Sequence, residues 1–377
     1  MTRQPFRHAL VIGKFYPPHL GHEYLIRSAA LHSSAVTVAV LGSSVESLSI
    51  AQRVQWLQSA FSDSAHVRVV GTLDDVPVNY GDEGIWQAHV DIMRDAVAQA
   101  DRAFTPLPPV DAVFTSERYG DRLASYFQCR HVCLDQSRNL YPTSGSAVRA
   151  SVPNQWHMLS PAVQAGLTLR LVVLGAESTG TTTLSQDLTG ALRVRSGVWA
   201  KTQWVAEYGR EYSANLLALA KVATPGASIY HIAWQSSDFT HVAQEQCRRE
   251  NSAAAHGGPV LVCDTDAWAT RLWHERYMGK PSAAVDAVAA GMPARALYIL
   301  TGECDVPFED DGLRDGEHLR RWMGQRFREE LNLQDVPWIE VQGTPVARCQ
   351  AALNTLDCLI ARHWTFAAPL PIVEAPA

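Results

Sequence analysis

Short apolar runs alternate with amphipathic segments along the chain, and this alternation predicts the fold. In the first half, β-branched and apolar runs typical of buried strands lie at 9–12, 36–41, 67–70, 112–114 and 131–134. Between them, apolar positions with helical spacing predict helices around 24–30 and at 52–60, 84–100 and 118–127. Strands that alternate with helices predict a parallel, doubly wound α/β sheet, with its site at the carboxyl ends of the strands.

A second alternating series follows the break at 161–168. Buried strands are expected at 169–174, 260–264, 297–300 and 338–341, with another just before 204–211 and helices at 316–331 and 345–361. A length of 377 residues also suggests two domains. We therefore predict two α/β domains, at 1–165 and 166–363, and a Pro/Ala-rich tail at 364–377 that we expect to be disordered.

Charge and cysteine content narrow the class of protein. The chain has 32 basic and 38 acidic residues, a net charge of −6 and no long basic run, which argues against nucleic-acid or membrane-surface binding. It has no signal-peptide pattern and no stretch of about eighteen apolar residues. The seven cysteines lack zinc spacing, as expected of reduced thiols. We expect a cytoplasmic protein whose partners are free nucleotides, and a homo-oligomer is compatible with the sequence.

The first chemical signal is the segment 13–22, GKFYPPHLGH, between a strand and a helix. A helix start favours anions, and His19 and His22 can both face one phosphate while Gly21 keeps the backbone out of its way. The two histidines could instead be surface residues or half of a metal pair. No HExxH or CxxC motif supplies further ligands for a metal, so we predict a polyphosphate site.

The second signal is the segment 143–149, TSGSAVR, at the start of a short helix. By itself it is equally well explained as a helix cap followed by a solvated arginine. Together, the two segments resemble the HxGH nucleotidyltransferases, through G-x-F-x-P-x-H-x-G-H and S-x-[ST]-x-x-R. The resemblance implies a Rossmann-like domain that transfers a nucleoside monophosphate and releases pyrophosphate. We expect His19, His22, Lys14, Ser144, Ser146 and Arg149 to hold phosphates and Gly13, Phe15 and Gly21 to be further nucleotide-binding positions.

The second half opens with a P-loop pattern that lacks its lysine. Segment 175–183, GAESTGTTT, has the spacing G-x-x-x-x-G-K-[ST], but Thr181 stands where lysine belongs. Backbone N–H groups can still hold phosphates, and the Thr182 hydroxyl can still face Mg²⁺. A glycine turn between strand and helix also occurs without a ligand. The nucleotide-binding residues we expect here are Gly175, Gly180, Thr181, Thr182 and Thr183.

Charged residues at later strand ends strengthen the nucleotide interpretation. Glu207 and Arg210 follow one predicted strand, and Asp264 ends another, where an acid suits Mg²⁺. The charged segment 309–315 is either a solvated loop or a lid that brings Arg314 onto the transferred phosphoryl group.

The motifs W-x-A-E-Y-G-R-E, D-T-D and D-D-G-L-R, together with HxGH, resemble the NadR family along 5–165 and 169–363. The resemblance implies a nicotinamide mononucleotide adenylyltransferase followed by a P-loop nicotinamide riboside kinase, with ATP as substrate, NAD as product and Mg²⁺ as cofactor. Some members carry an N-terminal helix-turn-helix repressor domain. Only eight residues precede the first strand here, so we do not expect DNA-binding repression.

The expected roles leave several alternatives open. His19, His22, Lys14 and Arg149 would neutralise the phosphates, Glu207 would take the ribose proton, and Asp264 would hold Mg²⁺ or the ribose, or those two acids could exchange roles. Arg314, and after it Lys201 or Arg210, could replace the missing lysine. Weaker substrate candidates are Trp86, Ser116, Glu117, Tyr208, Arg210 and Asp266. Trp86 could stack on a pyridine ring or be buried against the sheet.

The sequence leaves two other functions open. The adenylyl acceptor could be nicotinate mononucleotide, which differs by few atoms. Alternatively, the lysine-free P-loop domain could be a regulatory sensor that binds nucleotide without turnover.

Overall fold

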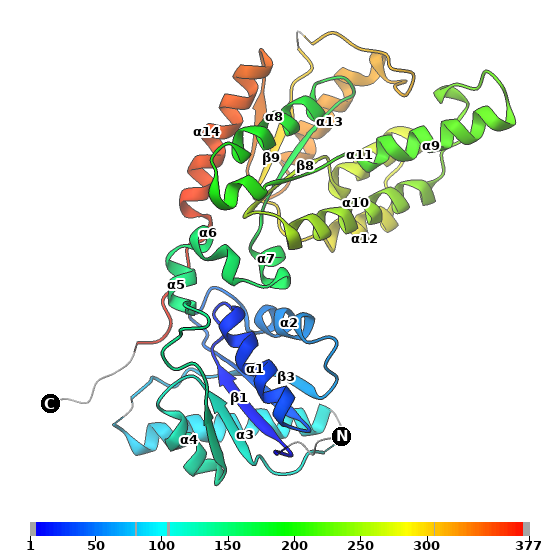
Figure 1. The fold of residues 1–377 in the computed structure, drawn as a ribbon. Coiled ribbons are helices and arrows are strands. Elements are labelled where there is room, and N and C mark those ends of the chain that lie inside the picture. The colour runs from blue at the N-terminus through cyan, green and yellow to red at the C-terminus, as the bar shows by residue number, and fades with distance from the viewer. Residues whose placement is uncertain (1–4, 80, 104–105, 305, 372–377) are drawn as a thin grey trace. The chain divides into compact units, whose positions relative to one another are not determined.

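Both predicted parallel sheets are present in the structure, a computed structural model that describes residues 5–79, 81–103, 106–304 and 306–371. The chain divides into two compact units, Met1–Val163 with Trp364–Ala377, and Gln164–His363. In the described residues each unit contains one five-stranded parallel sheet with helices on both faces (Figure 1). The predicted α/β class with two doubly wound sheets is therefore confirmed.

The first unit has the strand order β3-β2-β1-β4-β5. Its strands are β1 (Ala9–Gly13), β2 (Val36–Gly42), β3 (Val67–Leu73), β4 (Ala112–Thr115) and β5 (Arg130–Cys133). The connecting helices are α1 (Leu20–His32), α2 (Ile50–Ala60), α3 (Glu83–Ala103) and α4 (Gly120–Phe127). They are followed by α5 (Gly145–Ala150), α6 (Val152–Gln155), the 3₁₀ turn η1 (Trp156–Met158) and α7 (Pro161–Leu167), within which the second unit begins.

Alternate residues of β1 build two cores on opposite faces of this sheet. Ala9 and Val11 pack with residues of α1 and α2, whereas Leu10 and Ile12 pack with residues of α3 and α4. Successive side chains of a strand point to opposite faces, so a continuous apolar run is required when both faces are covered. This explains why 9–12 lacks the polar alternation of a half-exposed strand.

The second unit has the strand order β10-β9-β6-β8-β7. Its strands are β6 (Leu169–Gly175), β7 (Gln203–Val205), β8 (Val260–Asp264), β9 (Leu297–Thr301) and β10 (Trp338–Val341). Its helices are α8 (Thr181–Arg193), α9 (Tyr208–Ala223), α10 (Ser236–His256), α11 (Ala267–Met278), α12 (Ala283–Ala290), α13 (Arg320–Leu331) and α14 (Pro345–His363), with 3₁₀ turns η2 (Gly197–Lys201), η3 (Ile229–His231) and η4 (Glu317–Leu319).

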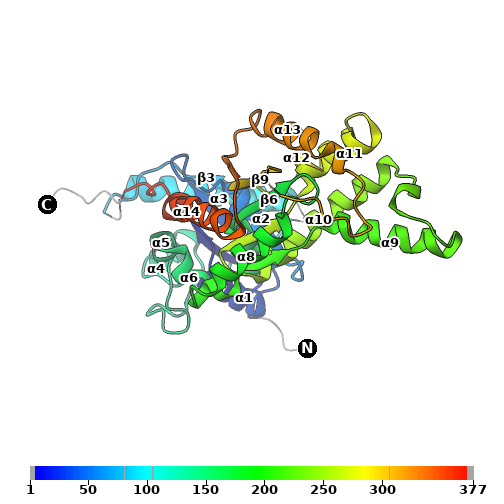
Figure 2. The same cartoon turned by 90° about the horizontal axis from the view of Figure 1, so that it is seen from above.

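The two faces of the second sheet are covered by different helices. Val172 and Leu174 of β6 share a core with residues of α11 and α13, including Leu272 and Phe327. On the other side, α8 and α14 lie next to each other, as both views show (Figure 2). Helix α10 packs against β7 and β8 and against α9, α11 and α12, and the apolar pattern had not predicted these four helices individually.

The end of the chain differs from the expected disordered tail. Residues 364–371, called the C-terminal segment below, belong to the first unit, and the backbone of Ala367 makes hydrogen bonds there with Tyr16 and Ser47. Paired backbone groups of this kind order a short segment without a helix or strand. The rest of the predicted tail, 372–377, lies outside the described residues. Residues 161–167, expected to be a break, form α7.

Candidate functional site

The predicted phosphate loop of the first unit lies at the carboxyl end of β1. His19 occupies the position before the first residue of α1, and His22 lies in its first turn. Their imidazole rings stack, with centroids 3.6 Å apart and planes 23° from parallel. The ring of Phe15 meets that of His22 edge-on, at 4.9 Å. The structure thus brings the two histidines together, as the HxGH spacing predicted.

Gly21 allows this stacking. A Cβ atom at Gly21 would lie 3.1 Å from Nδ1 of His19, which is tighter than most real contacts, and 3.4 Å from Cβ of Tyr141. A side chain here would therefore displace the His19 ring. At the start of the loop, a Cβ at Gly13 would lie 3.2 Å from the Phe15 ring. Glycine is therefore favoured at both positions, because the Phe15 ring lies close to Gly13 and the His19 ring lies close to Gly21.

Burial favours the neutral form of both histidines. Burial, with a smaller effect of Arg138, lowers the pKa of His19 to about 4, and burial and His19 lower the pKa of His22 well below its usual value. Nδ1 of each ring is buried and has no hydrogen-bond partner among the described residues. Buried polar atoms are usually paired, so these two nitrogens indicate a missing ligand such as a phosphate oxygen.

Lys14 is held beside the loop by a carboxylate. Its Nζ lies 3.1 Å from Oε1 of Glu46, whose other oxygen accepts a 2.7 Å hydrogen bond from Arg53. Arg53 is fully buried and also donates to the carbonyl of Lys14 at 2.9 Å. Glu46 and Arg53 were missed from the sequence because both lie in or next to α2, away from either motif.

The S-x-S-x-x-R element meets the phosphate loop through Arg149. Its Nη1 donates to the carbonyl of Tyr16 at 2.6 Å, and its Nη2 donates to Ser146 at 3.3 Å. The Ser144 hydroxyl accepts from the N–H of Ala147 and caps α5, so the capping role is real. A Cβ at Gly145 would lie 2.9 Å from the Tyr16 carbonyl oxygen. Segments more than 120 residues apart therefore form one site.

The weaker candidates of this unit do not join the loop in the same way. Trp86 is only 7% exposed and lies in the core, with its ring 6.1 Å from that of Tyr126. This favours the structural interpretation of Trp86. Ser116 is half-buried just after β4, and the exposed Glu117 pairs with Arg138 at 2.8 Å. Because Arg138 also lowers the pKa of both histidines, it is a cation near the site that sequence reasoning had not selected.

The P-loop of the second unit has the backbone that its glycines predict. Gly180 caps α8 with φ of +86°, a conformation that favours glycine. A Cβ at Gly175 would lie 2.2 Å from the Thr301 hydroxyl, so a side chain is excluded there. Two arginines missed from the sequence hold the loop from outside. Arg348 donates to the carbonyl of Thr179 at 2.7 Å, and Arg320 donates to that of Ser178 at 3.1 Å.

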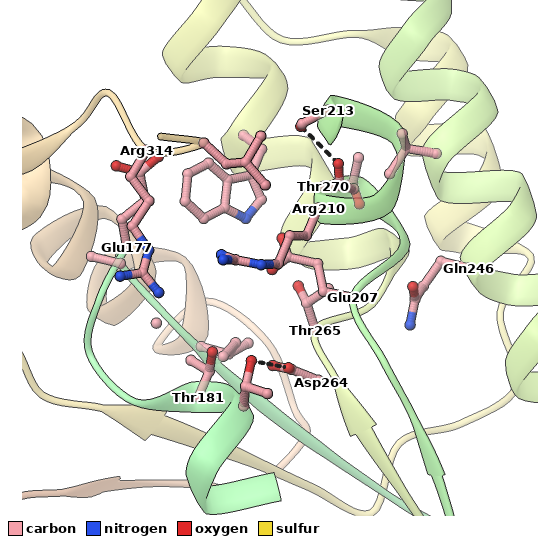
Figure 3. A pocket seen from close by; sticks show the side chains of 18 of the residues that line it. Glu177, Thr181, Glu207, Arg210, Ser213, Gln246, Asp264, Thr265, Thr270 and Arg314 are labelled. Carbon is pink, nitrogen blue, oxygen red and sulfur yellow. Dashed lines mark hydrogen bonds between the residues drawn. The ribbon is translucent and has the colours of Figure 1, made fainter. Parts of the chain in front are cut away.

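Strand register brings the predicted acids to this loop. Asp264 pairs with Val173, two residues before Gly175, and Val205 of β7 pairs with Cys263, so Glu207 follows at the same edge. The Thr182 hydroxyl donates a 2.6 Å hydrogen bond to Oδ2 of Asp264 (Figure 3). A hydroxyl and a carboxylate placed in this way match the protein oxygens that hold Mg²⁺ beside phosphates in P-loop proteins.

Glu207 lies in the same pocket, close to Asp264 and Arg210 (Figure 3). Burial, and then repulsion by Asp264, raise the pKa of Glu207 to about 8, while Arg210 opposes this shift. The carboxylate does not cap α9, although Glu207 immediately precedes that helix. An acid with a raised pKa that faces a pocket is a candidate general base.

The charged segment 309–315 contacts the P-loop. Ser178 accepts hydrogen bonds from Arg314 at 3.2 Å, and its hydroxyl also accepts one from the N–H of Glu309 at 2.9 Å. Asp311 binds Arg210, and Arg314 lies 3.6 Å from the same carboxylate. These contacts fit the predicted lid better than a solvated loop. They also show that Arg210 is held by the lid.

Two pockets meet at the P-loop, and Ser178, Thr181, Thr182 and Arg314 line both. One pocket extends over the loop and the start of α14, past Thr183, Pro307 and Arg348. The other extends over Glu207 and Asp264 and ends at aromatic side chains, namely Trp234, Phe239, Trp273 and Tyr277. In this second pocket Nε1 of Trp234 and Nε2 of Gln246 are buried without a partner among the described residues. These aromatic residues are scattered just before α10, in α10 and in α11, so they form no motif by which the sequence could reveal them.

Two sequence candidates lie away from this pocket. Asp266 is fully buried; it caps α11 and binds Arg295 at 3.0 Å and Tyr298 at 2.9 Å, so it is a structural residue rather than a substrate ligand. Lys201 precedes the amino end of β7, whereas Glu207 follows the carboxyl end of this strand, and Lys201 lines neither pocket at the P-loop. Tyr208 is half-buried and bonds His241 at 3.1 Å, outside the residues that line the pocket.

The described residues lack two features, a ready-made metal site and a membrane-spanning helix. They contain no cluster of three or more His, Cys, Asp or Glu side chains arranged to bind a metal ion without further ligands. None of the described helices is both long and apolar enough to cross a bilayer.

Comparisons with known proteins agree with this geometry. A family model described as an AAA domain matches residues 170–348, the P-loop unit. The "Trifunctional NAD biosynthesis/regulator protein NadR" of Escherichia coli is 24% identical over 329 residues, which is 83% of this chain and 72% of that protein. Its Salmonella typhimurium counterpart is 23% identical over 339 residues, or 85% of this chain and 75% of that protein.

Solved structures with the same fold carry the same name. A NadR protein in complex with NR matches with a TM-score of 0.65 at 17% identity, covering 100% of both chains. A NadR protein in complex with NAD and AMP-PNP matches with a TM-score of 0.61 at 16% identity, covering 99% of this chain and 100% of the other. The chain is therefore similar to the NadR proteins and shares the two-unit α/β fold of the solved NadR structures along its length.

Proposed function

We propose that the chain forms NAD in two ATP-dependent steps. The second unit phosphorylates the 5′-hydroxyl of nicotinamide riboside, and the first unit joins the resulting mononucleotide to the adenylyl group of ATP. The relatives named NAD biosynthesis/regulator proteins, and the similar structures that hold NR, NAD and AMP-PNP, support this substrate set.

The meeting of two pockets at the P-loop carries the proposal. ATP fits the pocket over Gly180 and Arg348, since a helix start and loop N–H groups favour phosphates. The riboside fits the aromatic pocket, where flat rings suit a pyridine and the unpaired nitrogens of Trp234 and Gln246 suit a carbonyl oxygen. The γ-phosphate then lies where the pockets join, at Thr182 and Arg314.

The kinase step needs one carboxylate that accepts a proton and another that binds the metal ion. Asp264, bonded to Thr182, fits the metal side; Mg²⁺ bound there would neutralise charge on the β- and γ-phosphates. Glu207 is then left to accept the proton of the ribose 5′-hydroxyl as its oxygen attacks the γ-phosphorus and ADP leaves. The Thr182 bond thus favours this assignment over the exchanged one.

Arg314 substitutes for the charge that Thr181 lacks. It lines both pockets and donates to Ser178 within the loop, so its guanidinium lies beside the predicted γ-phosphate position. Arg210 is held by Asp311 and comes second. Arginine carries the same positive charge as the lysine of an ordinary P-loop, and it can bind two phosphate oxygens at once. Arg314 can therefore supply the missing charge.

Adenylyl transfer in the first unit requires alignment rather than a base. An oxygen of the mononucleotide phosphate attacks the α-phosphorus of ATP, the bond to the β-phosphate breaks and pyrophosphate leaves. Neutral His19 and His22 each donate one N–H, and bound phosphates would raise their pKa values toward the cationic form. Arg149 and Lys14 supply permanent charge, although Lys14 must leave Glu46 in part to do so.

One assay tests the whole proposal. The purified chain is incubated with MgATP and, separately, with nicotinamide riboside, nicotinamide mononucleotide and the two nicotinate analogues, and ADP and pyrophosphate are measured. We expect ADP with the riboside and pyrophosphate with the mononucleotide. Faster reaction of the nicotinate compounds would reassign the acceptor.

The absent lysine supports a second candidate. If Thr181 makes the P-loop unit a sensor, the chain would bind MgATP and make dinucleotide from the mononucleotide, but would release no ADP with any pyridine riboside. The stoichiometry of equilibrium binding of a non-hydrolysable ATP analogue, measured beside the ADP assay, separates a sensor from an empty loop. Two sites per chain indicate that both units bind ATP, and one site indicates an empty P-loop.

A further inference from the structure

The C-terminal segment contacts Tyr16 of the phosphate loop through Phe366 and Ala367. The N–H of Ala367 donates to Oγ of Ser47 at 2.6 Å, and its carbonyl accepts from the hydroxyl of Tyr16 at 3.0 Å. The N–H of Ser47 donates to the same Tyr16 hydroxyl at 2.9 Å. Beside them, the Phe366 ring meets Tyr16 edge-on, with centroids 6.0 Å apart. Both backbone groups of Ala367 are thus paired to side chains of the first unit.

Tyr16 is in turn the residue that orients Arg149. Two guanidinium groups lie over its ring, with Cζ of Arg149 4.7 Å and Cζ of Arg53 5.1 Å from the ring centroid. Its carbonyl accepts the 2.6 Å hydrogen bond from Nη1 of Arg149. Arg149 therefore has two contacts with one tyrosine, one to the ring face and one to the backbone. The position of the cation depends on that of Tyr16.

We propose that the C-terminal segment positions the adenylyl-transfer site by holding Tyr16, and through it Arg149, against the phosphate loop. The inference rests on the proposed adenylyl transfer in the first unit. Tyr16 is 2% exposed, and Phe366 and Ala367 supply part of its cover. Without them the tyrosine would keep Ser47 but lose its second hydrogen bond and the edge-on ring. Arg149 would then lose its defined geometry while remaining in the site.

This arrangement makes the first unit depend on residues that follow the second unit in sequence. The segment begins one residue after α14 ends, and α14 carries Arg348, which binds the P-loop carbonyl of Thr179. A fragment that ends at the boundary predicted from the sequence would lack Phe366 and Ala367. Complete adenylyl transfer therefore requires the whole chain.

The test uses full-length variants. Phe366→Ala and Tyr16→Phe each remove one contact of the segment and leave His19, His22 and Arg149 in place. We expect each to lower kcat for pyrophosphate release about tenfold, with a smaller change in KM, because misplaced charge affects the transition state most. Phe366→Tyr keeps the ring and should restore the rate. Val346→Ala, an exposed apolar truncation on α14, is the matched control and should leave both activities unchanged.

A second measurement follows the contact itself. Hydrogen exchange of the peptide containing 364–371 should be slow in the wild type and at least about tenfold faster in Ser47→Ala, which removes the acceptor of the Ala367 N–H. Riboside-dependent ADP release should not change in any of these variants.

The outcomes separate the two ideas. A wild-type chain that forms no dinucleotide overturns the proposed function and this inference with it. If the wild type is active and Phe366→Ala and Tyr16→Phe keep its kcat, only the positioning role is overturned. Faster exchange at 364–371 without any loss of rate leads to the same conclusion, because the segment would then merely cover the surface.

Discussion

The hydroxyl of Thr182 donates a 2.6 Å hydrogen bond to the carboxylate of Asp264, across 82 residues of sequence. This bond ties the P-loop to the end of β8 and marks where a metal would be held. We predict that Asp264→Asn abolishes riboside-dependent ADP release, because an amide loses the charge that Mg²⁺ requires. Pyrophosphate release from mononucleotide and ATP should persist, since Asp264 belongs to the second unit.

Asp187→Asn is the matched control for this experiment. Asp187 is exposed on α8, so the substitution makes the same charge change away from the pocket and should leave both rates unchanged. Equal loss of both activities in Asp264→Asn would mean that the substitution unfolds the chain or that the two sites are coupled.

The stacked histidines lead to a second prediction. His22→Ala should lower pyrophosphate release by at least about a hundredfold, the scale of losing one preorganised donor to the phosphates. Folding should survive, because Nδ1 of His22 has no partner among the described residues. His32→Ala, at the exposed end of α1, serves as the control. A loss below about tenfold in a folded variant would remove His22 from the proposed site.

The third prediction concerns the charge that replaces the P-loop lysine. Arg314→Ala should lower kcat for ADP release by about a hundredfold and weaken ATP binding less, because loop amides hold the ground state while the cation acts on the transferred group. Thr181→Lys should recover much of this loss in the double variant. Arg321→Ala, an exposed arginine on α13, is the control. Retention of the wild-type rate in Arg314→Ala would assign the charge to another residue, with Arg210 first.

The raised pKa of Glu207 gives a prediction about pH and activity. The base must be ionised, so kcat/KM for the riboside should rise with pH and level off above about 8, since this ratio reports the pKa of the free enzyme. Glu207→Gln should remove ADP release at every pH. A pH-independent kcat/KM between 6 and 9 in the wild type would argue against Glu207 as the base.

The same group links pH to stability. The folded-state pKa of Glu207 lies above the usual 4.5, so the folded chain holds this proton more tightly than the unfolded chain, and stability falls as pH rises from 4.5 through 8. Glu207→Gln carries no such proton. The melting temperature of Glu207→Gln minus that of the wild type should therefore be larger at pH 8 than at pH 5. If the melting temperatures of the variant and the wild type differ by the same amount at pH 5 and pH 8, burial does not raise the pKa of Glu207.

The sequence by itself determined the features that depend on neighbours along the chain. Strand and helix alternation follows from apolar spacing, and the two phosphate loops are contiguous segments at strand ends, so 13–22 and 175–183 could be located directly. Parallel topology then predicted that Glu207 and Asp264 would reach the same edge as the P-loop, and the register of β6, β7 and β8 brings them there.

Only the tertiary structure decided which side chains face a site and which support it. Asp264 and Asp266 are two residues apart, yet one lines the pocket while the other is buried against Arg295. The aromatic pocket wall and the contact of Ala367 with Tyr16 join residues far apart in sequence. Such contacts depend on how helices and chain ends pack. They are stabilised by burial and hydrogen bonds between residues that are far apart in sequence. Neither the spacing of apolar residues nor the composition of a segment therefore predicts them.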